Sequence, residues 1–321
     1  MKAYTVVVGG ANMDLLGVPK KHLKQGTSNA GKVSSSPGGV GRNIAENLVR
    51  LGQTCCLMAP IGDDANGLFL QHHAQQLGIQ TECMVTLAGE STSTYLSIID
   101  AAGDMQVAIA DMALIDQFGE LQLEPFLPHL QGAALVVLDT NLAPHCLAYL
   151  MQHAPQQHFF VDTVSVAKAT RISPFLSNIH SLKPNLMEAQ AIAGKDFGSH
   201  PSKAQLLELA QWFMTQGVQH LYLSLGSKGL VYSDAKQTFI AIASAPLESI
   251  DIINSNGAGD AMMAAISDAW LLGCDASQRV ARALACAQIA MASETTISPH
   301  LSPHFLSRML KENPCIITPL N

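Results

Sequence analysis

The chain has 321 residues, of which 48% are hydrophobic and only 13% are charged, so it can bury a large core and is not a disordered chain. Its 18 lysines and arginines face 25 aspartates and glutamates, which gives a net charge of −7. Because no dense cluster of lysine and arginine occurs, we expect no nucleic-acid partner.

Two further properties of the sequence bear on where the protein works. No apolar run reaches the roughly 18 residues that span a bilayer, so we expect no membrane partner. The segment 1–14 lacks the long apolar region of a signal peptide, and the seven cysteines are scattered without a CxxC pair. This pattern argues against a disulfide framework or a zinc ribbon and favours a reduced, cytoplasmic protein.

Short β-rich runs alternate along the chain with segments of helical periodicity. We expect strands at residues 4–8, 55–61, 135–139, 159–162, 181–183 and 220–225. We expect helices at 44–51, 68–77, 143–152, 186–193 and 204–216, and two apolar helices at 261–272 and 276–293. Strands separated by helices in this way form βαβ units, so the sequence predicts an α/β fold with a mostly parallel central sheet covered on both faces.

Two segments interrupt the alternation. Residues 16–35 are polar and show no helical period, and residues 91–110 contain two extended runs, 94–99 and 105–109, around a turn at 100–103. Both segments are too short to be domains, so we expect residues 1–321 to form a single domain with a small β-lid over one edge of the main sheet. The exposed edge of such a lid could pair with another chain, so a homodimer through the lid is a further expectation.

A glycine-rich cluster, P-G-G-V-G-R-N at residues 37–43, stands directly before the helix expected from residue 44. Glycines such as Gly38 and Gly39 let a ligand approach the backbone closely. The amide group of Asn43 could bond a ligand hydroxyl. The alternative is a tight turn in which Asn43 only caps the helix.

A second cluster, N-S-N-G-A-G-D at residues 254–260, opens the helix expected at 261–272. Gly257, Ala258 and Gly259 carry no bulk over their amide groups, and amides at a helix N-terminus favour an anion. Asp260 could take a proton from a hydroxyl beside that anion, so the cluster predicts a phosphoryl-transfer site. The alternative is an ordinary glycine-rich turn followed by an acidic residue that the helix dipole stabilises.

Two weaker clusters and one lysine also follow strands. In K-P-N-L-M-E at 183–188, Asn185 and Glu188 have the spacing either of a helix capping box or of two groups near hydrated Mg²⁺ on one helical face. In S-L-G-S-K-G at 224–229, a glycine loop suits the ribose or phosphate of a nucleotide. Lys168 follows the strand at 159–162 and could offset charge on a phosphoryl group or its acceptor; the alternative is a solvated surface lysine.

Several enzyme classes lack their signatures in this sequence. There is no GxxxxGK[ST] of a P-loop enzyme and no GxSxG of a hydrolase. A nicotinamide-dependent oxidoreductase is disfavoured, because no GxGxxG follows the first strand.

Five motifs occur in a fixed order along the chain. They are Asn12 and Asp14 after the first strand, G-G-x-G-x-N from Gly38 ending in Leu-Gly at 51–52, I-G-D-D-x-x-G at 61–67, N-x-x-E at 185–188 and N-G-A-G-D at 256–260. Together they resemble the ribokinase-like, PfkB-type family of carbohydrate and nucleoside kinases over essentially the whole chain. The resemblance implies a three-layer ribokinase-like α/β sandwich with a β-lid, and phosphorylation of a sugar or nucleoside hydroxyl with ATP and Mg²⁺.

The resemblance also implies roles for individual residues. The anion hole would be formed by Gly257, Ala258 and Gly259, with Asp260 as the catalytic base. The substrate-binding residues would be Asn12, Asp14, Gly38, Gly39 and Asn43, to which its position adds Lys168. The nucleotide would contact Asn185, Ser224, Gly226 and Gly229, with Asn185 and Glu188 serving Mg²⁺. Asn254 stands where many members have an aspartate beside a monovalent cation, so a monovalent cation stays open. Leu284 stands where many members have an adenine-side asparagine, so the adenine contacts stay open as well.

Within the family, five stretches resemble the members that act on pseudouridine. They are residues 28–32, 37–45, 89–97, 160–165 and 259–264. Two of them fall in the expected lid or its flanks, where a nucleoside base would be read, so we expect the 5′-hydroxyl of pseudouridine as the acceptor. The alternatives are another sugar or nucleoside, or a ligand-binding relative without catalysis. Asp260 argues against the last, since such a relative needs no carboxylate after the anion hole.

Overall fold

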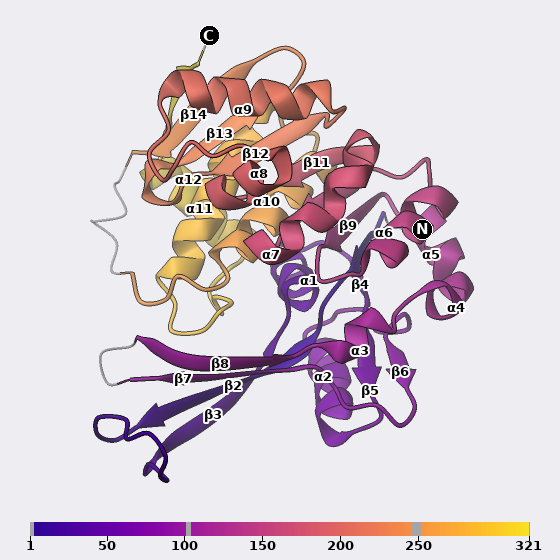
Figure 1. Ribbon diagram of the computed structural model, residues 1–321. Helices are drawn as coiled ribbons and strands as arrows, with labels where there is room; N and C mark the ends of the chain where they lie inside the picture. Colours follow the sequence, from indigo (N-terminus) through magenta and orange to yellow (C-terminus); the bar gives the residue numbers. More distant parts are fainter. Residues whose placement is uncertain (1–2, 101–103, 245–251, 321) are drawn as a thin grey trace.

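The computed structural model describes residues 3–100, 104–244 and 252–320, and its largest element is a nine-stranded sheet (Figure 1). Six neighbouring strands are parallel: β4 (Cys55–Met58), β1 (Thr5–Val8), β9 (Leu135–Asp139), β10 (Phe159–Asp162), β11 (Ile179–Lys183) and β12 (His220–Ser224). Three antiparallel strands extend the sheet beyond β12: β13 (Leu230–Ser233), β14 (Thr238–Ala243) and β15 (Cys315–Pro319).

Helices pack on both faces of this sheet, which confirms the three-layer α/β fold. Along β1, Val6 and Val8 point to one face and Val7 to the other, and all three are fully buried, as in a sheet covered on both sides. The face of Val7 is covered by α1 (Val40–Arg50), α2 (Ala65–Gln76), α10 (Ala258–Leu271), α11 (Ala276–Met291) and α12 (Pro303–Glu312). The opposite face is covered by α3 (Ala113–Asp116), α4 (Glu120–Leu123), α5 (Leu127–Gln131), α6 (Pro144–His153), α7 (Val166–Ala169), α8 (Leu186–Ala193) and α9 (Lys203–Thr215).

A second sheet of four strands projects from the body and forms the lid, at the lower left of Figure 1. Its order is β3 (Gly31–Gly38), β2 (Asn12–Pro19), β7 (Thr94–Ile99) and β8 (Met105–Asp111). The lid is larger than the predicted segments 16–35 and 91–110, since it already begins at Asn12 and ends its first hairpin at Gly38. The β7–β8 hairpin is confirmed, but residues 101–103 of its predicted turn lie outside the described residues.

The two faces of the lid differ chemically because side chains alternate along a strand. Register places Asp14 beside Ser36 and Tyr95, and Leu16 beside Ser34 and Ser97. We call these six residues the inner face of the lid, because they line a cleft against the body. The outer face pairs Leu96 with Ile109 and Ile98 with Val107, and exposes Val33 as well.

Several elements differ from the sequence expectations. One predicted strand at 55–61 is wrong: Ala59 separates β4 from β5 (Pro60–Gly62), which leaves the central sheet and pairs with β6 (Val85–Leu87). Helix α1 begins at Val40 and α10 at Ala258, each several residues earlier than predicted. No helix within the described ranges is long and apolar enough to cross a membrane.

Candidate active site

The turn before α10 has a conformation that glycine adopts readily. Gly257 is the N-cap of the helix with φ of 80°, and a Cβ added there would overlap the carbonyl oxygen of Thr296. Ala258, Gly259 and Asp260 form the first turn, where backbone amides have no acceptor four residues earlier in the helix. The predicted anion-hole residues therefore present amide groups at a helix N-terminus, where an anion is stabilised.

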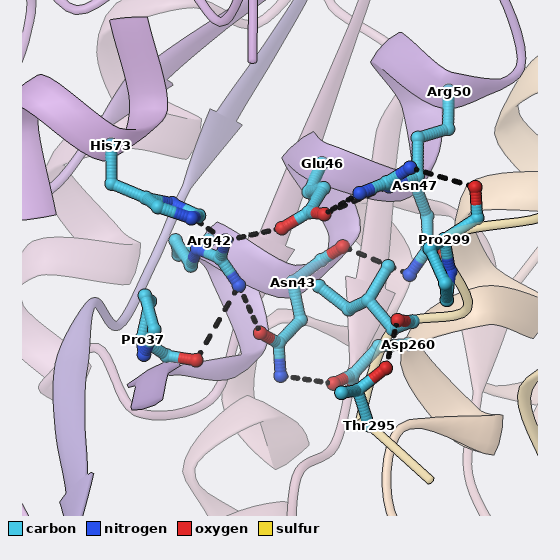
Figure 2. Close-up of polar contacts among 11 residues, drawn as sticks. Pro37, Arg42, Asn43, Glu46, Asn47, Arg50, His73, Asp260, Thr295 and Pro299 are labelled. Atoms are coloured by element: carbon cyan, nitrogen blue, oxygen red, sulfur yellow. Dashed lines mark hydrogen bonds and ion pairs between the residues drawn. The ribbon is translucent and has the colours of Figure 1, made fainter. Parts of the chain in front are cut away.

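Asp260 is buried at this N-terminus and contacts α1. Asn43 donates a hydrogen bond from Nδ2 to Oδ2 of Asp260 over 2.8 Å, as Figure 2 shows. Burial, followed by the negative charge of Asp162, raises the pKa of Asp260 to about 7, while the bond from Asn43 opposes that rise. A carboxylate with a pKa near neutrality is matched to general-base chemistry at physiological pH.

Three neighbouring parallel strands end in charged, buried residues beside Asp260. They are Asp139 on β9, Asp162 on β10 and Lys183 on β11. Lys183 forms an ion pair with Asp162, with Nζ 3.0 Å from Oδ2. A Cβ added at Gly259 would lie 3.3 Å from the same Nζ, so this ammonium group is adjacent to the predicted anion hole.

The sequence reasoning did not select Lys183 as a site residue. The position of Lys183 could have pointed to it, because a lysine at the end of a short strand in the core of an α/β sheet must be paired or lie at a ligand. Asp139 was missed in the same way, and it holds two glycine-rich turns together. Its Oδ2 accepts from the amides of Gly10, at 2.8 Å, and Gly41, at 2.7 Å.

The predicted sugar-binding residues come together where the lid meets α1. Asn12 on β2 pairs with Gly38 on β3, and Asn12 donates from Nδ2 to Oδ1 of Asp14 over 2.6 Å. A Cβ added at Gly38 would overlap the Asp14 carboxylate. Gly39, with φ of 97°, is the N-cap of α1, so β3 and α1 are joined with a single residue between them.

Asn185 and Glu188 form the helix capping box that was one of the two alternatives. The Asn185 Oδ1 accepts from the Glu188 amide, and the Glu188 carboxylate accepts from the Asn185 amide at 2.8 Å. Thr163 also donates to Glu188 Oε2 over 2.6 Å. Among the described residues, no three His, Cys, Asp or Glu side chains are grouped to hold a metal ion. One buried carboxylate with spare lone pairs still fits Mg²⁺ that keeps its waters and a phosphate.

Lys168 is half-buried and donates from Nζ to Oδ1 of Asn141 over 2.6 Å. Burial lowers its pKa. The contact joins Lys168, in α7, to the loop after β9 that carries Asn141. It is neither a freely solvated lysine nor in contact with Asp260 through a described bond.

The segment after Asp162 contains a strained turn. Val164 has φ of 59°, which is rare for a β-branched residue, and the Ser165 amide donates to the Thr163 carbonyl over 2.6 Å. This bond between residues two apart closes a γ-turn. The turn directs Thr163 towards Glu188.

Two cavities flank the turn 254–260. The first, of about 330 Å³, combines the predicted nucleotide residues Ser224, Gly226 and Gly229 with Ala258 and Gly259 of the helix N-terminus. Its remaining wall is mostly apolar and includes Ile242, Ala243, Ile252, Met262, Leu284, Ala287 and Met291. We call it the apolar pocket; its size and lining suit a flat, largely apolar ring.

The second cavity, of about 520 Å³, lies between the inner face of the lid and the body. We call it the polar cleft. Its body side includes Arg42, His73, Asn254, Asn256 and Thr295. The turn that carries Asp260 therefore has an apolar pocket on one side and a polar cleft on the other.

Comparison with known proteins defines the class. A model of the pfkB family of carbohydrate kinases matches residues 2–303, so the chain belongs to that family and is a phosphotransferase with an alcohol acceptor. The chain is 35% identical over 315 residues to the pseudouridine kinase of Escherichia coli K12, covering 98% of this chain and 99% of that one. It is also 35% identical over 299 residues to the uncharacterized sugar kinase YeiI of the same strain, covering 93% of this chain and 81% of that protein.

Solved structures agree on the fold. The ribokinase of Arabidopsis thaliana, solved with ribose and ATP, superimposes with a TM-score of 0.84 at 18% identity. That comparison covers 97% of this chain and 99% of the ribokinase. The ribokinase-like three-layer architecture with its lid is thereby confirmed.

Proposed function

We propose that this protein phosphorylates the 5′-hydroxyl of pseudouridine, with ATP as donor and Mg²⁺ as cofactor. The observation that carries the proposal is the position of Asp260 on a helix N-terminus between the apolar pocket and the polar cleft. The relationship to pseudouridine kinase along the whole chain supports the choice of substrate. The ATP in the Arabidopsis ribokinase supports the choice of donor.

The residues divide the reaction between them. The apolar pocket takes the adenine ring, and Ser224, Gly226 and Gly229 lie along the nucleotide towards the amides of Ala258 and Gly259. Asp260 removes the proton of the 5′-hydroxyl as that oxygen attacks the terminal phosphorus of ATP, and the bond from this phosphorus to the bridging oxygen breaks to release ADP. The helix amides and Lys183 offset the negative charge on the migrating phosphoryl group. Mg²⁺, when bound, neutralises phosphate charge, and Glu188 with Asn185 would hold its waters.

The ribose is held at the base of the polar cleft. Asn12, Asp14 and Asn43 supply side-chain partners for its hydroxyls, and Gly38 and Gly39 let the sugar approach the backbone. Lys168, in α7, donates to Asn141 on the loop after β9 and is a further candidate for substrate binding. Asn254, at the position where many family members have an aspartate beside a monovalent cation, lines the cleft with an amide, so the requirement for such a cation stays open.

The base of the nucleoside meets the inner face of the lid. Ser34 and Ser36 on β3, with Tyr95 and Ser97 on β7, bring hydroxyl groups to the cleft from the two strands that flank β2. Pseudouridine has a C–C glycosidic bond, so its N1–H is a free donor that uridine lacks. A hydroxyl that accepts from N1–H is left unpaired when uridine binds, and such unpaired buried groups discriminate strongly.

A substrate panel tests the proposal: ATP with pseudouridine, uridine, ribose and fructose, following ADP release. We expect the highest kcat/KM for pseudouridine. Equal turnover of ribose or uridine would still be consistent with a carbohydrate kinase, but it would contradict pseudouridine as the preferred substrate. The equal identity to YeiI makes another sugar or nucleoside the second candidate, and the same panel distinguishes the two.

Two further proposals concern the setting of the enzyme. Seven free cysteines, of which five are buried, suit a reducing cytoplasm.

The apolar outer face of the lid, where Val33 is 72% and Ile109 61% exposed, supports a homodimer in which two lids pack together. Sedimentation of the wild type and of a Val33→Lys, Ile109→Lys variant tests it: a wild type that sediments as a monomer would exclude the dimer.

A further inference from the structure

A chain of three charged side chains, two of them buried, runs along α1 next to the proposed base. Arg42, Glu46 and Arg50 stand one helical turn apart, and Arg42 and Glu46 are each 4% exposed. Glu46 is paired on both sides, with Arg42 and with Arg50, whose Nε donates to Oε1 over 2.8 Å. Figure 2 shows that this chain ends next to Asn43 and Asp260.

The Arg42 guanidinium contacts four groups. It donates to Glu46, to Oδ1 of Asn43 at 3.1 Å, to Nδ1 of His73 at 3.3 Å, and to the carbonyl of Pro37 at 3.5 Å. Arginine has only donors, so each of these groups must accept. Arg42 therefore fixes which end of the Asn43 side chain faces it.

The orientation of Asn43 matters because its amide has two unlike ends. With Oδ1 turned towards Arg42, Nδ2 points to Asp260 and donates to its carboxylate over 2.8 Å. A rotated amide would bring Oδ1 against the carboxylate, so that two acceptors would face each other. Asp260 would then lose its donor.

We propose that Arg42 is a positioning residue that holds Asn43 as a donor to the catalytic base, and so sets the pH range in which the base is ready. The inference rests on the proposed role of Asp260. Arg42 lines the polar cleft from the body side, and Glu46 keeps its charge compensated.

The other groups that face Asp260 come from three strands. Asp162 on β10 and Asp139 on β9 oppose its ionisation, as burial does, whereas Lys183 on β11 and the Asn43 bond favour it. Loss of Arg42 leaves all three strand residues in place. Its effect on the base must therefore pass through Asn43, which makes the inference specific.

A structural role is the competing explanation. Arg42 also ties Pro37 at the end of the lid to α2 through His73. If that is its whole role, its removal lowers the melting temperature and leaves the pH dependence of catalysis unchanged.

The experiment compares Arg42→Met with Arg50→Met by the pH profile of kcat/KM and by thermal melting. Arg50 shares Glu46 with Arg42 but does not contact Asn43, so it is the matched control. We expect Arg42→Met to move the acidic limb upwards by about one pH unit, the size of a lost hydrogen bond to a carboxylate, and Arg50→Met to leave it in place. Arg42→Met/Glu46→Gln removes both charges and should show the same shift, even if the single variant folds poorly.

Two results would overturn the inference. One is an unchanged limb in a folded Arg42 variant; the other is an Asn43→Ala background in which Arg42→Met still adds a shift. An NMR titration of the Asp260 carboxyl carbon measures the same pKa without turnover. Asp260→Asn in the activity assay separates the catalytic role of Asp260 from the positioning role of Arg42. Full activity of this variant would contradict Asp260 as the base, whereas the NMR titration would still test whether Arg42 affects the Asp260 carboxyl group.

Discussion

The two ends of the neighbouring strands β10, β11 and β12 accommodate ionisable residues in different ways. At the carboxyl ends, Asp162 on β10 and Lys183 on β11 form a buried ion pair beside Asp260. At the amino ends, His158 precedes β10, His180 lies in β11 and His220 opens β12. These rings pack against one another with centroids 4.7 Å apart, and His180 stacks on Phe160.

The difference lies in compensation. At the carboxyl end Asp162 and Lys183 compensate each other as an ion pair, whereas at the amino end burial, with neighbouring histidines and Arg279, lowers the pKa of His180 to about 3. Burial and Arg279 lower the pKa of His220 to about 4. A buried ion pair is thus present beside the proposed base, whereas at the amino end burial disfavours the charged form of the histidines. Substitutions at the carboxyl end and protonation of the histidines at the amino end test this contrast.

Asp260→Asn gives the largest expected effect at the carboxyl end. The amide has almost the same shape but cannot accept the proton, so kcat should fall by about 10²–10⁴-fold while the fold is kept. Turnover by ADP release and a circular dichroism spectrum check both parts. A loss of less than about tenfold would mean that Asp260 is not the base.

Lys183→Met should break the compensation itself. Asp162 would remain buried without its partner, which costs on the order of 3–5 kcal/mol in the free energy of unfolding. Asp162→Asn/Lys183→Met removes both charges and should recover much of that loss. Urea denaturation measures the two variants; a single variant no less stable than the double would show that the pair is not coupled.

The pH dependence of catalysis should report the raised pKa of Asp260. The base acts only when ionised, so kcat/KM should fall below about pH 7, by about tenfold for each further unit of acidification. Assays in a series of buffers at constant ionic strength give the profile. A flat profile down to pH 5 would contradict burial of an uncompensated carboxylate.

The smallest effect is expected at the histidine end. His180 stays neutral in the fold, whereas in the unfolded chain it takes up a proton near 6.5, its ordinary pKa. Its contribution to stability is therefore present above that pH and is lost as the pH falls from about 6.5 towards 3. Over the first unit of acidification, from about pH 6.5 to about pH 5.5, the wild type should lose on the order of 1 kcal/mol relative to His180→Phe.

The variant pair controls for opposing groups. Asp260, with its raised pKa, stabilises the fold on acidification, but both proteins carry it and the difference cancels it. His72→Phe, on the exposed surface of α2, is the matched control and should behave like the wild type. A constant difference between wild type and His180→Phe at all pH values would show that His180 is not held neutral.

Much of the architecture is readable from the sequence because buried parallel strands are short apolar runs between amphipathic helices. Residues 135–139 and 159–162 are predicted to the residue. Strands β13, β14 and β15 are missed, since they leave the βαβ alternation and depend on antiparallel pairing at the sheet edge. Helix α12 is missed with them.

The site is only partly readable. The glycine-rich turns at Gly39 and Gly257 can be recognised in the sequence, because both positions have positive φ, a conformation that favours glycine. The sequence cannot show that Lys183 lies next to Gly259, since β11 and α10 are more than seventy residues apart. The role of Arg42 depends on the direction of one amide, which only packing reveals.

The γ-turn at Val164 matters to anyone who would engineer this enzyme. A β-branched residue held at positive φ costs on the order of 1–3 kcal/mol, so glycine there offers a direct gain in thermal robustness. The same turn aims Thr163 at Glu188 and places the Val164 amide 3.0 Å from the Asp162 carboxylate. Relaxing it would loosen both contacts, so robustness and turnover are coupled at this one residue.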